Sequence, residues 1–335
     1  MTASPLVDPH GRVVKDLRIS VTDRCNFRCT YCMPQEGMAW LPRSEVLTFE
    51  EIERIARVCV ERYGFDSLRL TGGEPTVRAQ LSVLVARLAA LTVPATGEPV
   101  DLAMTTNGAT LALLAHDLKA AGLRRINISL DSLRPDRFAE ITRRDQLARV
   151  LDGILAARAA GFDPVKVNVV LVRGVNDDEI VDFARFGRDH GVQVRFIEFM
   201  PLDADGAWTL ERVVPSAEVI AAIAEHWPLE AVEHGPEPAA RWRYADGRGE
   251  VGVVASVTQP FCGNCDRVRI TAEGQLRNCL FAVEETDLRA VMRSGGSDDD
   301  LARAIAGDVG RKWAGHQIGN VAFVRPRRSM SQIGG

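Results

Sequence analysis

The feature that most constrains the fold is a regular alternation of short apolar runs and longer amphipathic stretches between residues 17 and 198. Runs rich in β-branched residues are typical of strands, and apolar residues spaced three and four apart are typical of helices. Several amphipathic stretches are followed by glycine, which commonly ends a helix. The pattern predicts an α/β fold with a parallel sheet, open or curled into a barrel. The expected strands are 17–21, 67–71, 101–104, 125–129, 165–170 and 193–198, and the expected helices are 49–63, 79–91, 110–121, 147–160 and 177–190.

The pattern changes after residue 200, because single strand and helix units give way to hairpins. We expect a first unit at 13–200, a second at 201–320 and a tail at 321–335. The tail belongs to a segment, 315–335, that has no helix or strand pattern. Within the second unit we expect a helix at 215–227, hairpins at 241–254 and 267–278, and helices at 284–293 and 298–313.

Composition and charge exclude several classes of protein. Hydrophobic residues make up 46% of the chain and charged residues 26%, which is ordinary globular usage. No apolar run reaches the roughly 18 residues of a membrane helix, and the first 14 residues lack the apolar core of a signal peptide. The formal charge of −4 gives no electrostatic signal for nucleic acid or an anionic membrane. We therefore expect a soluble, cytoplasmic protein.

Six of the seven cysteines fall into two groups of three. Cys25, Cys29 and Cys32 directly follow the first expected strand, at the sheet edge where α/β barrels carry their chemistry. Three thiolates are one short of a tetrahedral zinc site or a fully ligated four-iron cluster. The triplet therefore favours a cluster with one open iron, and a structural zinc site completed by a distant histidine is the alternative. The remaining cysteine, Cys59, lies in an amphipathic helix and is expected to be a core residue.

Cys262, Cys265 and Cys279 form the second triplet. Zinc commonly binds Cys-x-x-Cys pairs, but no fourth cysteine follows, and the next histidine, His316, lies 37 residues beyond Cys279. A second three-cysteine cluster is therefore favoured over zinc.

Basic residues on the expected strands point to a bound anion. Arg267 and Arg269 flank Val268, so their side chains share one face beside the second triplet. Arg18, Arg69 and Lys166 alternate with apolar neighbours and should point into the interior of a barrel. Lys166 is the most informative of the three, because lysine occurs at only four positions of the chain. Because lone buried cations are costly and arginine holds phosphate oxygens bidentately, the set suggests a phosphate chain.

Several motifs together resemble a known family. The first triplet, with Tyr31 before its last cysteine, resembles that of the radical S-adenosylmethionine superfamily. Thr71-Gly72-Gly73-Glu74-Pro75 ends the second strand, where glycines let the backbone approach a ligand's amino group and Glu74 and Thr71 could hold it. The run 16–29, the second triplet with Arg267–Arg269 and the terminal Gly334-Gly335 resemble the GTP 3′,8-cyclase family of molybdenum cofactor biosynthesis over residues 13–335.

The resemblance implies an incomplete (β/α)6 TIM-type barrel whose opening is closed by a C-terminal α+β region. It also implies two [4Fe-4S] clusters, S-adenosylmethionine, and GTP as a substrate cyclised to (8S)-3′,8-cyclo-7,8-dihydroguanosine 5′-triphosphate through a 5′-deoxyadenosyl radical. By this resemblance Cys25, Cys29 and Cys32 bind cluster one and Cys262, Cys265 and Cys279 bind cluster two; Tyr31, Gly73, Ser129 and Met200 bind S-adenosylmethionine; Arg18, Arg69, Thr105, Lys166, Arg267, Val268 and Arg269 bind GTP; and Gly334 and Gly335 are catalytic.

The implied partners are a flavodoxin- or ferredoxin-like electron donor and the next pathway enzyme, cyclic pyranopterin monophosphate synthase, and the sequence leaves a homodimer open. Two rival functions remain. One is another radical enzyme with an auxiliary cluster, such as a peptide maturase, and the other is a non-enzymatic iron–sulfur carrier. The maturase would bind a peptide and has no need for the inward-pointing cations or the Gly-Gly tail, and the carrier would need neither the Gly-Gly-Glu-Pro turn nor an open iron. We further expect the terminal glycines to enter the barrel, because Ser329–Ile333 is too apolar for a solvated tail.

Overall fold

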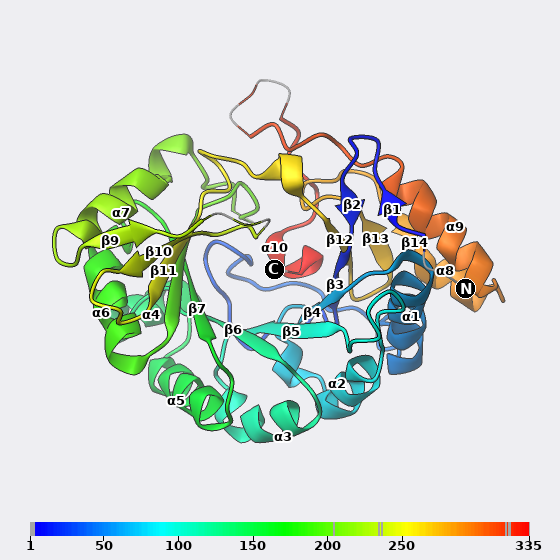
Figure 1. The fold of residues 1–335 in the computed structure, drawn as a ribbon, viewed down its shortest axis with the longest axis horizontal. Coiled ribbons are helices and arrows are strands. Elements are labelled where there is room, and N and C mark those ends of the chain that lie inside the picture. Colours follow the sequence, from blue (N-terminus) through cyan, green and yellow to red (C-terminus); the bar gives the residue numbers. More distant parts are fainter. Residues whose placement is uncertain are drawn as a thin grey trace.

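Six parallel strands in chain order form the centre of the fold, and helices line the convex side of the curved sheet (Figure 1). The computed structural model describes residues 4–203, 205–233, 235, 237–318, 320 and 323–334. The expected α/β fold is confirmed. The six strands are β3 (Asp16–Ser20), β4 (Ser67–Thr71), β5 (Asp101–Thr106), β6 (Arg125–Ser129), β7 (Val165–Leu171) and β8 (Gln193–Glu198).

Among the helices of this part of the chain, the longest has the bounds that local signals predict, whereas the helix expected at 110–121 forms only at Ala115–Ala120, and the helix at Pro135–Thr142 was not expected. The longest begins after Thr48, whose hydroxyl accepts from the Glu51 amide while the Glu51 carboxylate accepts from the Thr48 amide. It ends at Gly64, whose φ of 71° is the left-handed conformation that glycine adopts at low cost. The helices are α1 (Phe49–Tyr63), α2 (Leu81–Ala89), α3 (Ala115–Ala120), α4 (Pro135–Thr142), α5 (Leu147–Ala159), α6 (Ile180–His190) and α7 (Ser216–Ala224), with short 3₁₀ helices η1 (Pro75–Val77), η2 (Leu111–Leu113), η3 (Asp177–Glu179) and η4 (Leu210–Arg212).

The two expected C-terminal hairpins extend the sheet at opposite ends. The strand at 250–254, from the first hairpin, pairs in parallel with β8, and the strand at 267–270, from the second hairpin, pairs in parallel with β3. The strand order of the sheet is β14-β13-β12-β3-β4-β5-β6-β7-β8-β11-β10-β9. Among the described residues the sheet does not close into a barrel, because β14 and β9 pair with no further strand. The additional strands are β9 (Leu229–Ala231), β10 (Ala240–Tyr244), β11 (Glu250–Val254), β12 (Arg267–Ile270), β13 (Gln275–Arg277) and β14 (Thr286–Asp287).

The expected helix at 284–293 is wrong in its first half. Thr286 and Asp287 instead pair with β13, and Asp287 caps the helix that follows. The expected patternless tail is also wrong near its end, where Ser329 and Gln332 form a capping box. The elements concerned are α8 (Leu288–Arg293), α9 (Asp298–Val309) and α10 (Met330–Ile333), besides η5 (Cys262–Asn264) and an N-terminal hairpin of β1 (Leu6–Val7) and β2 (Val13–Val14).

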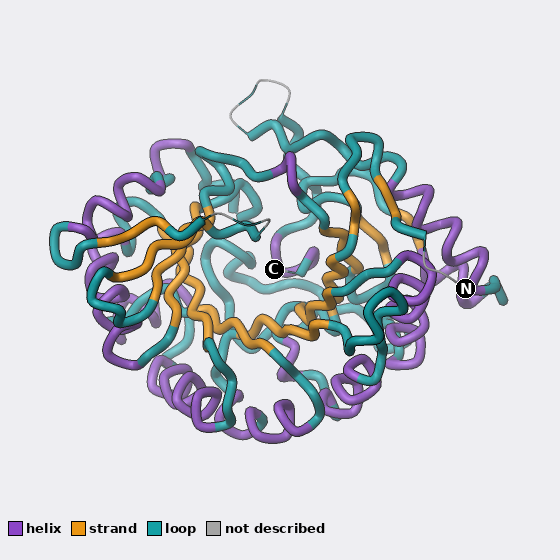
Figure 2. Tube along the Cα trace, viewed as in Figure 1, coloured by secondary structure: helices purple, strands orange, loops and turns teal. Residues whose placement is uncertain are grey.

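The two faces of the central sheet differ in character. In β7 the odd-numbered residues Val165 to Leu171 are buried in the main core, where the helices pack. The even-numbered residues, Lys166 among them, face the concave side. Figure 2 shows the strands as a curved band with the C-terminal helix α10 inside the curve. Polar side chains of the strands and the end of the chain therefore share one interior.

In the described part of the chain no helix is long and apolar enough to span a membrane.

Candidate functional site

A cavity of about 190 Å³ lies where the central strands reach their carboxyl ends. The segment after β3 contributes the first cysteine triplet and Tyr31, and the turn after β4 contributes Gly73. Later strand ends add further predicted residues, and α10 covers the space with Met330 and Ser331. The cavity thus brings together Cys25, Cys29, Cys32, Tyr31, Gly73, Thr105, Ser129 and Met200.

The glycines after β4 allow close packing between two loops. A Cβ on Gly72 would lie 2.5 Å from the Thr22 carbonyl oxygen, and one on Gly73 would lie 2.5 Å from the Asp23 and Arg24 carbonyl oxygens. Backbone hydrogen bonds of 2.8 Å join the Gly73 amide to Thr22 and the Glu74 amide to Arg24. The two glycines therefore allow this turn to pack against the segment that leads into Cys25.

Glu74 is engaged by the protein on both of its oxygens. The carboxylate accepts from the Thr76 amide at 3.0 Å, the Thr106 hydroxyl at 2.6 Å and the Asn107 amide at 2.6 Å. It thereby ties the loop after β4 to the loop after β5. The nearby Thr71 hydroxyl is buried without a hydrogen-bond partner among the described residues, and it lies next to Gly334.

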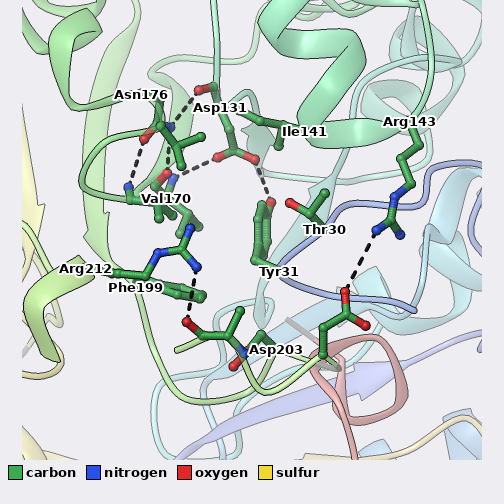
Figure 3. A pocket seen from close by; sticks show the side chains of 14 residues that line it. Thr30, Tyr31, Asp131, Ile141, Arg143, Val170, Asn176, Phe199, Asp203 and Arg212 are labelled. Atoms are coloured by element: carbon green, nitrogen blue, oxygen red, sulfur yellow. Dashed lines mark hydrogen bonds and ion pairs between the residues drawn. The ribbon is translucent and has the colours of Figure 1, made fainter. Parts of the chain in front are cut away.

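Tyr31 and Asp131 separate this cavity from a neighbouring one of about 180 Å³ (Figure 3). The Tyr31 hydroxyl donates to Asp131 Oδ2 at 2.6 Å, and the Val170 amide donates to Asp131 Oδ1 at 2.8 Å. Asn176 bonds to the main chain of both Asp131 and Val170. Burial raises the pKa of Asp131 to about 6, although both hydrogen bonds oppose the rise. The dividing wall is held from three segments of the chain.

The first triplet has the chemistry of a cluster site. Burial raises the pKa of Cys25 to about 11 and that of Cys32 to about 12, so neither thiol is an activated nucleophile. In the described residues no three Cys, His, Asp or Glu side chains converge on the position of a single metal ion. A four-iron cluster instead takes each cysteine on a different iron, and three thiols around one cavity fit that requirement.

A row of arginines crosses the concave face below this cavity. Arg269 on β12 is in register with Arg18 on β3, and Arg18 is in register with Arg69 on β4. Like charges at opposed positions on neighbouring strands destabilise a sheet. The Nε atoms of Arg18 and Arg69 are buried without a hydrogen-bond partner, and the ion pair of Arg18 with Asp16 is long, at 4.0 Å. Among the described residues, Asp16 is the one carboxylate that pairs with this row, so a bound anion would stabilise it.

Two more cations face the same interior from β7 and β8. Lys166 lies on the concave face of β7, as predicted. Arg195 on β8 was missed, although alternation within Gln193–Glu198 would have revealed it. Its guanidinium donates to Asn168 at 3.1 Å and Asn127 at 2.9 Å, two neutral acceptors that leave its charge unbalanced.

Burial and mutual repulsion lower the pKa values of this whole cationic set. Burial lowers the pKa of Arg18 to about 9 and those of Arg69 and Arg195 to about 10, with neighbouring arginines adding to each shift. Burial and then Arg195 lower the pKa of Lys166 to about 8. A bound polyanion would reverse these shifts, because an opposite charge favours the protonated form.

The second triplet lies at the other end of the same strands. Cys265 precedes β12, which runs parallel to β3, whereas the first triplet follows β3. The two triplets are thus separated by about the length of the strand, roughly 16 Å for five residues at 3.3 Å each. Burial tends to raise the pKa of Cys265, but the charges of Arg267 and Lys312 outweigh it and bring the pKa to about 7. Arg267 lies 3.4 Å from the Cys265 sulfur.

Buried cations from both ends of the chain hold the second triplet in place. Arg12 donates to the carbonyl oxygens of Cys262 at 2.6 Å and Ala314 at 2.8 Å. Lys312 donates to the carbonyl oxygens of Arg267, at 2.7 Å, and Asn278. Neither residue was predicted, because their acceptors are main-chain groups that no sequence pattern marks.

The C-terminal segment contacts the arginine row directly. Arg269 donates to the Gly334 carbonyl oxygen at 2.9 Å, and Ser20 donates to that of Ile333 at 3.2 Å. A Cβ on Gly334 would lie 2.1 Å from Ser20 Oγ and 2.7 Å from Thr71 Oγ1. The segment therefore enters the concave interior, and Gly335 lies outside the described residues.

Two other predicted positions are now located. The Val268 side chain is buried in the main hydrophobic core, so it does not share the face of its two arginine neighbours. Cys59 is a buried core residue of α1, as expected.

Two family profiles divide the chain between them. The radical SAM superfamily matches residues 19–187, and molybdenum cofactor synthesis C matches residues 192–318. Together they span both cysteine triplets and two members of the arginine row, Arg69 and Arg269.

Individual relatives match over nearly the whole chain. A GTP 3′,8-cyclase of Streptomyces coelicolor is 49% identical over 99% of this chain and 97% of its own length. A GTP 3′,8-cyclase of Mycobacterium sp. (strain KMS) is 48% identical over 100% of this chain and 95% of its own length. Among solved structures, Streptococcus suis SuiB bound to S-adenosylmethionine is similar in fold, with a TM-score of 0.58 and 14% identity over 89% of this chain and 69% of that one.

Proposed function

The chain belongs to the GTP 3′,8-cyclase family of the radical SAM superfamily, and we propose that it converts GTP to (8S)-3′,8-cyclo-7,8-dihydroguanosine 5′-triphosphate. The observation that carries this proposal is the registered row of Arg269, Arg18 and Arg69 between two cysteine triplets. A triphosphate supplies the negative charge that the row lacks. A peptide substrate or a carrier function would leave these cations unbalanced in the interior.

The first triplet holds a [4Fe-4S] cluster with one open iron, and S-adenosylmethionine binds it in the cavity beside Tyr31. Gly73, Ser129 and Met200 line that cavity, and we assign them to the same ligand. If bound, these groups would supply a 5′-deoxyadenosyl radical, formed with one electron from outside the chain, that takes the hydrogen from C3′ of GTP. The C3′ radical would then add to C8 of guanine, and a second electron and a proton would complete the 7,8-dihydro product. The protein's part is to fix both partners and to exclude water, which α10 does by covering the cavity.

GTP spans the concave face between the two triplets. Arg18, Arg69, Lys166 and Arg269 hold its triphosphate with Arg195, and Arg267 and Thr105 lie toward the two ends of this interior. Val268 contributes only through its main chain, because its side chain is in the core. Cys262, Cys265 and Cys279 would hold the second cluster, which would offer the guanine an open iron. Fixing a substrate at both ends contributes several kcal/mol, with roughly 7–11 as the upper limit for well-oriented reactions.

The finer organisation follows from this assignment. The central strands act as a partial barrel over residues 13–200, residues 201–320 carry the second cluster, and residues 321–335 deliver Gly334 and Gly335 to the reaction. We place the reaction in the cytoplasm, with a flavodoxin- or ferredoxin-like electron donor and cyclic pyranopterin monophosphate synthase as the enzyme that takes the product. A homodimer is compatible with this arrangement.

One anaerobic assay tests the function. The reconstituted protein is incubated with S-adenosylmethionine and dithionite, with and without GTP, and 5′-deoxyadenosine and nucleotide products are quantified. We expect deoxyadenosine and cyclised nucleotide to form together and to depend on GTP. Deoxyadenosine that forms at the same rate without GTP, and no cyclised nucleotide, would favour a peptide-modifying enzyme. A protein that forms neither product would be an iron–sulfur carrier.

A further inference from the structure

A groove of about 610 Å³ runs along the outer side of the loop that leads into the first triplet. Thr22, Asp23 and Arg24 line it immediately before Cys25. The same three residues pack against Gly72 and Gly73, which line the cysteine cavity on the inner side. Two packed segments, 22–24 and 72–73, therefore lie between the groove and the cavity of the first triplet, and Arg24 is directly followed by Cys25.

The groove is net positive, because four arginines line it against two carboxylates, Asp23 and Glu50. Within the described ranges, no carboxylate pairs with Arg24, Arg43 or Arg78, all of which line the groove. Arg78 donates to the Leu47 carbonyl oxygen at 2.8 Å and lies over the Phe49 ring. Burial and then the charge of Arg43 lower the pKa of Arg78, which shows that the two guanidinium groups repel each other. This local charge is opposite in sign to the net charge of the chain, −4.

One arginine of the groove, Arg87, does pair with carboxylates. Arg87 pairs with Glu50 at 2.7 Å and with Glu53 at 3.5 Å. Between the charged groups lie two exposed apolar side chains, Val77 at 40% and Val83 at 43% exposure. A surface with apolar contacts inside a basic rim suits a partner whose apolar centre is ringed by carboxylates.

This inference rests on the proposed function, because radical cleavage of S-adenosylmethionine consumes one electron that must come from outside the chain. We propose that the groove docks a small acidic electron-transfer protein of the flavodoxin kind, with the edge of its flavin against Val77 and Val83. One electron leaves the reduced donor, which is oxidised by one electron. The first cluster is reduced by one electron across the Thr22–Arg24 segment.

The test compares two sources of electrons in the same holoenzyme. Arg43→Glu and Val83→Glu are combined in one variant, and 5′-deoxyadenosine formation is measured with a reduced acidic flavodoxin and, separately, with dithionite. We expect the flavodoxin-driven kcat/KM at low ionic strength to fall by roughly tenfold or more, within the 10–10³ range of electrostatic steering. The dithionite-driven rate should equal that of the wild type, because the small reductant needs no docking surface.

Two controls make the outcome decisive. Arg149→Glu combined with Leu155→Glu brings the same change of charge on the exposed face of α5, because in the described structure Arg149 has no ion-pair partner and Leu155 is 51% exposed. This control variant should leave both rates unchanged. Added salt should slow the flavodoxin reaction of the wild type more than that of the variant. An unchanged flavodoxin-driven rate in the variant would overturn the docking site. A dependence on Arg43 and Val83 with a ferredoxin but not with a flavodoxin would overturn the assigned partner. A wild-type protein that forms no 5′-deoxyadenosine with dithionite would instead count against the proposed function.

Discussion

Replacing Gly334 with alanine should uncouple product formation from S-adenosylmethionine cleavage. The residue has φ +86° and ψ 109°, a region that alanine adopts only at a cost of about 1–3 kcal/mol. The new Cβ would also lie 2.1 Å from Ser20 Oγ, so the hydroxyl or the segment must move. If the segment moves, the hydrogen bond from Arg269 is lost as well, which costs about 1.5–3 kcal/mol for a charged donor.

These amounts add to about 2.5–6 kcal/mol against the docked segment. The cost falls on the last residues of the chain, so we expect the melting temperature and the iron content of Gly334→Ala to match the wild type. Cyclised nucleotide should fall at least tenfold relative to 5′-deoxyadenosine, measured by chromatography of the same quenched reaction. Gly307→Ala is the matched control, because a Cβ there meets no atom within 4 Å.

A second variant separates the two sources of the effect. Ser20→Ala removes the oxygen at 2.1 Å and leaves the Ser20 Cβ at 3.4 Å from the added methyl group. The double variant should therefore recover part of the lost product yield, while the backbone cost and the 2.7 Å contact with Thr71 Oγ1 remain. Normal coupling in Gly334→Ala would refute the reasoning, because it would mean that the docked segment does not take part in the reaction.

Three further outcomes are expected. Arg269→Ala should weaken GTP binding by about 1.5–3 kcal/mol in equilibrium dialysis and leave guanosine binding unchanged; an equal loss for both ligands would argue against a triphosphate contact. Alanine at Cys262, Cys265 and Cys279 together should lower reconstituted iron from about eight to about four per chain and preserve the first cluster, whereas stoichiometric zinc in the wild type would contradict the second cluster. Because the pKa of Lys166 is lowered to about 8, GTP affinity should fall as pH rises from about 7 to 9, and Lys166→Met should lose this dependence; a parallel fall in Lys166→Met would show that another group titrates.

The same pKa shift has a consequence for stability. The folded pKa of Lys166, about 8, lies below its ordinary value of 10.5. Between these two values the unfolded chain binds the proton and the folded chain does not. The contribution of Lys166 to the stability of the GTP-free protein therefore increases as pH rises from about 8 to 10.5.

Local pattern was sufficient for most of the central elements. The bounds expected for β4, β6, β8 and α1 coincide with the structure, because alternation, capping residues and terminal glycines act within a few residues of one another. Alternation also placed Lys166 on the concave face, and applying it to β8 would have placed Arg195 there too. The spacing of the first triplet was enough to indicate a cluster with an open iron.

Other features depended on which distant segments meet. Alternation predicted the orientation of Arg18, Arg69 and Arg269. Only the pairing of β12 with β3 and of β3 with β4 placed the three side by side. The roles of Arg12 and Lys312 were hidden, because a main-chain carbonyl acceptor has no signature in the sequence. Likewise, β14 formed where a helix was expected, since the free edge of β13 offered hydrogen bonds that helical periodicity cannot anticipate.

The sequence by itself determined the chemistry of this protein, through side chains whose type and spacing are local. Only the tertiary structure decided where that chemistry is assembled. The terminal glycine is the clearest case, since Gly334 has a defined conformation only because Ser20, Thr71 and Arg269 surround it. Contacts between residues more than 60 positions apart depend on the whole sheet, and no short stretch of sequence encodes them.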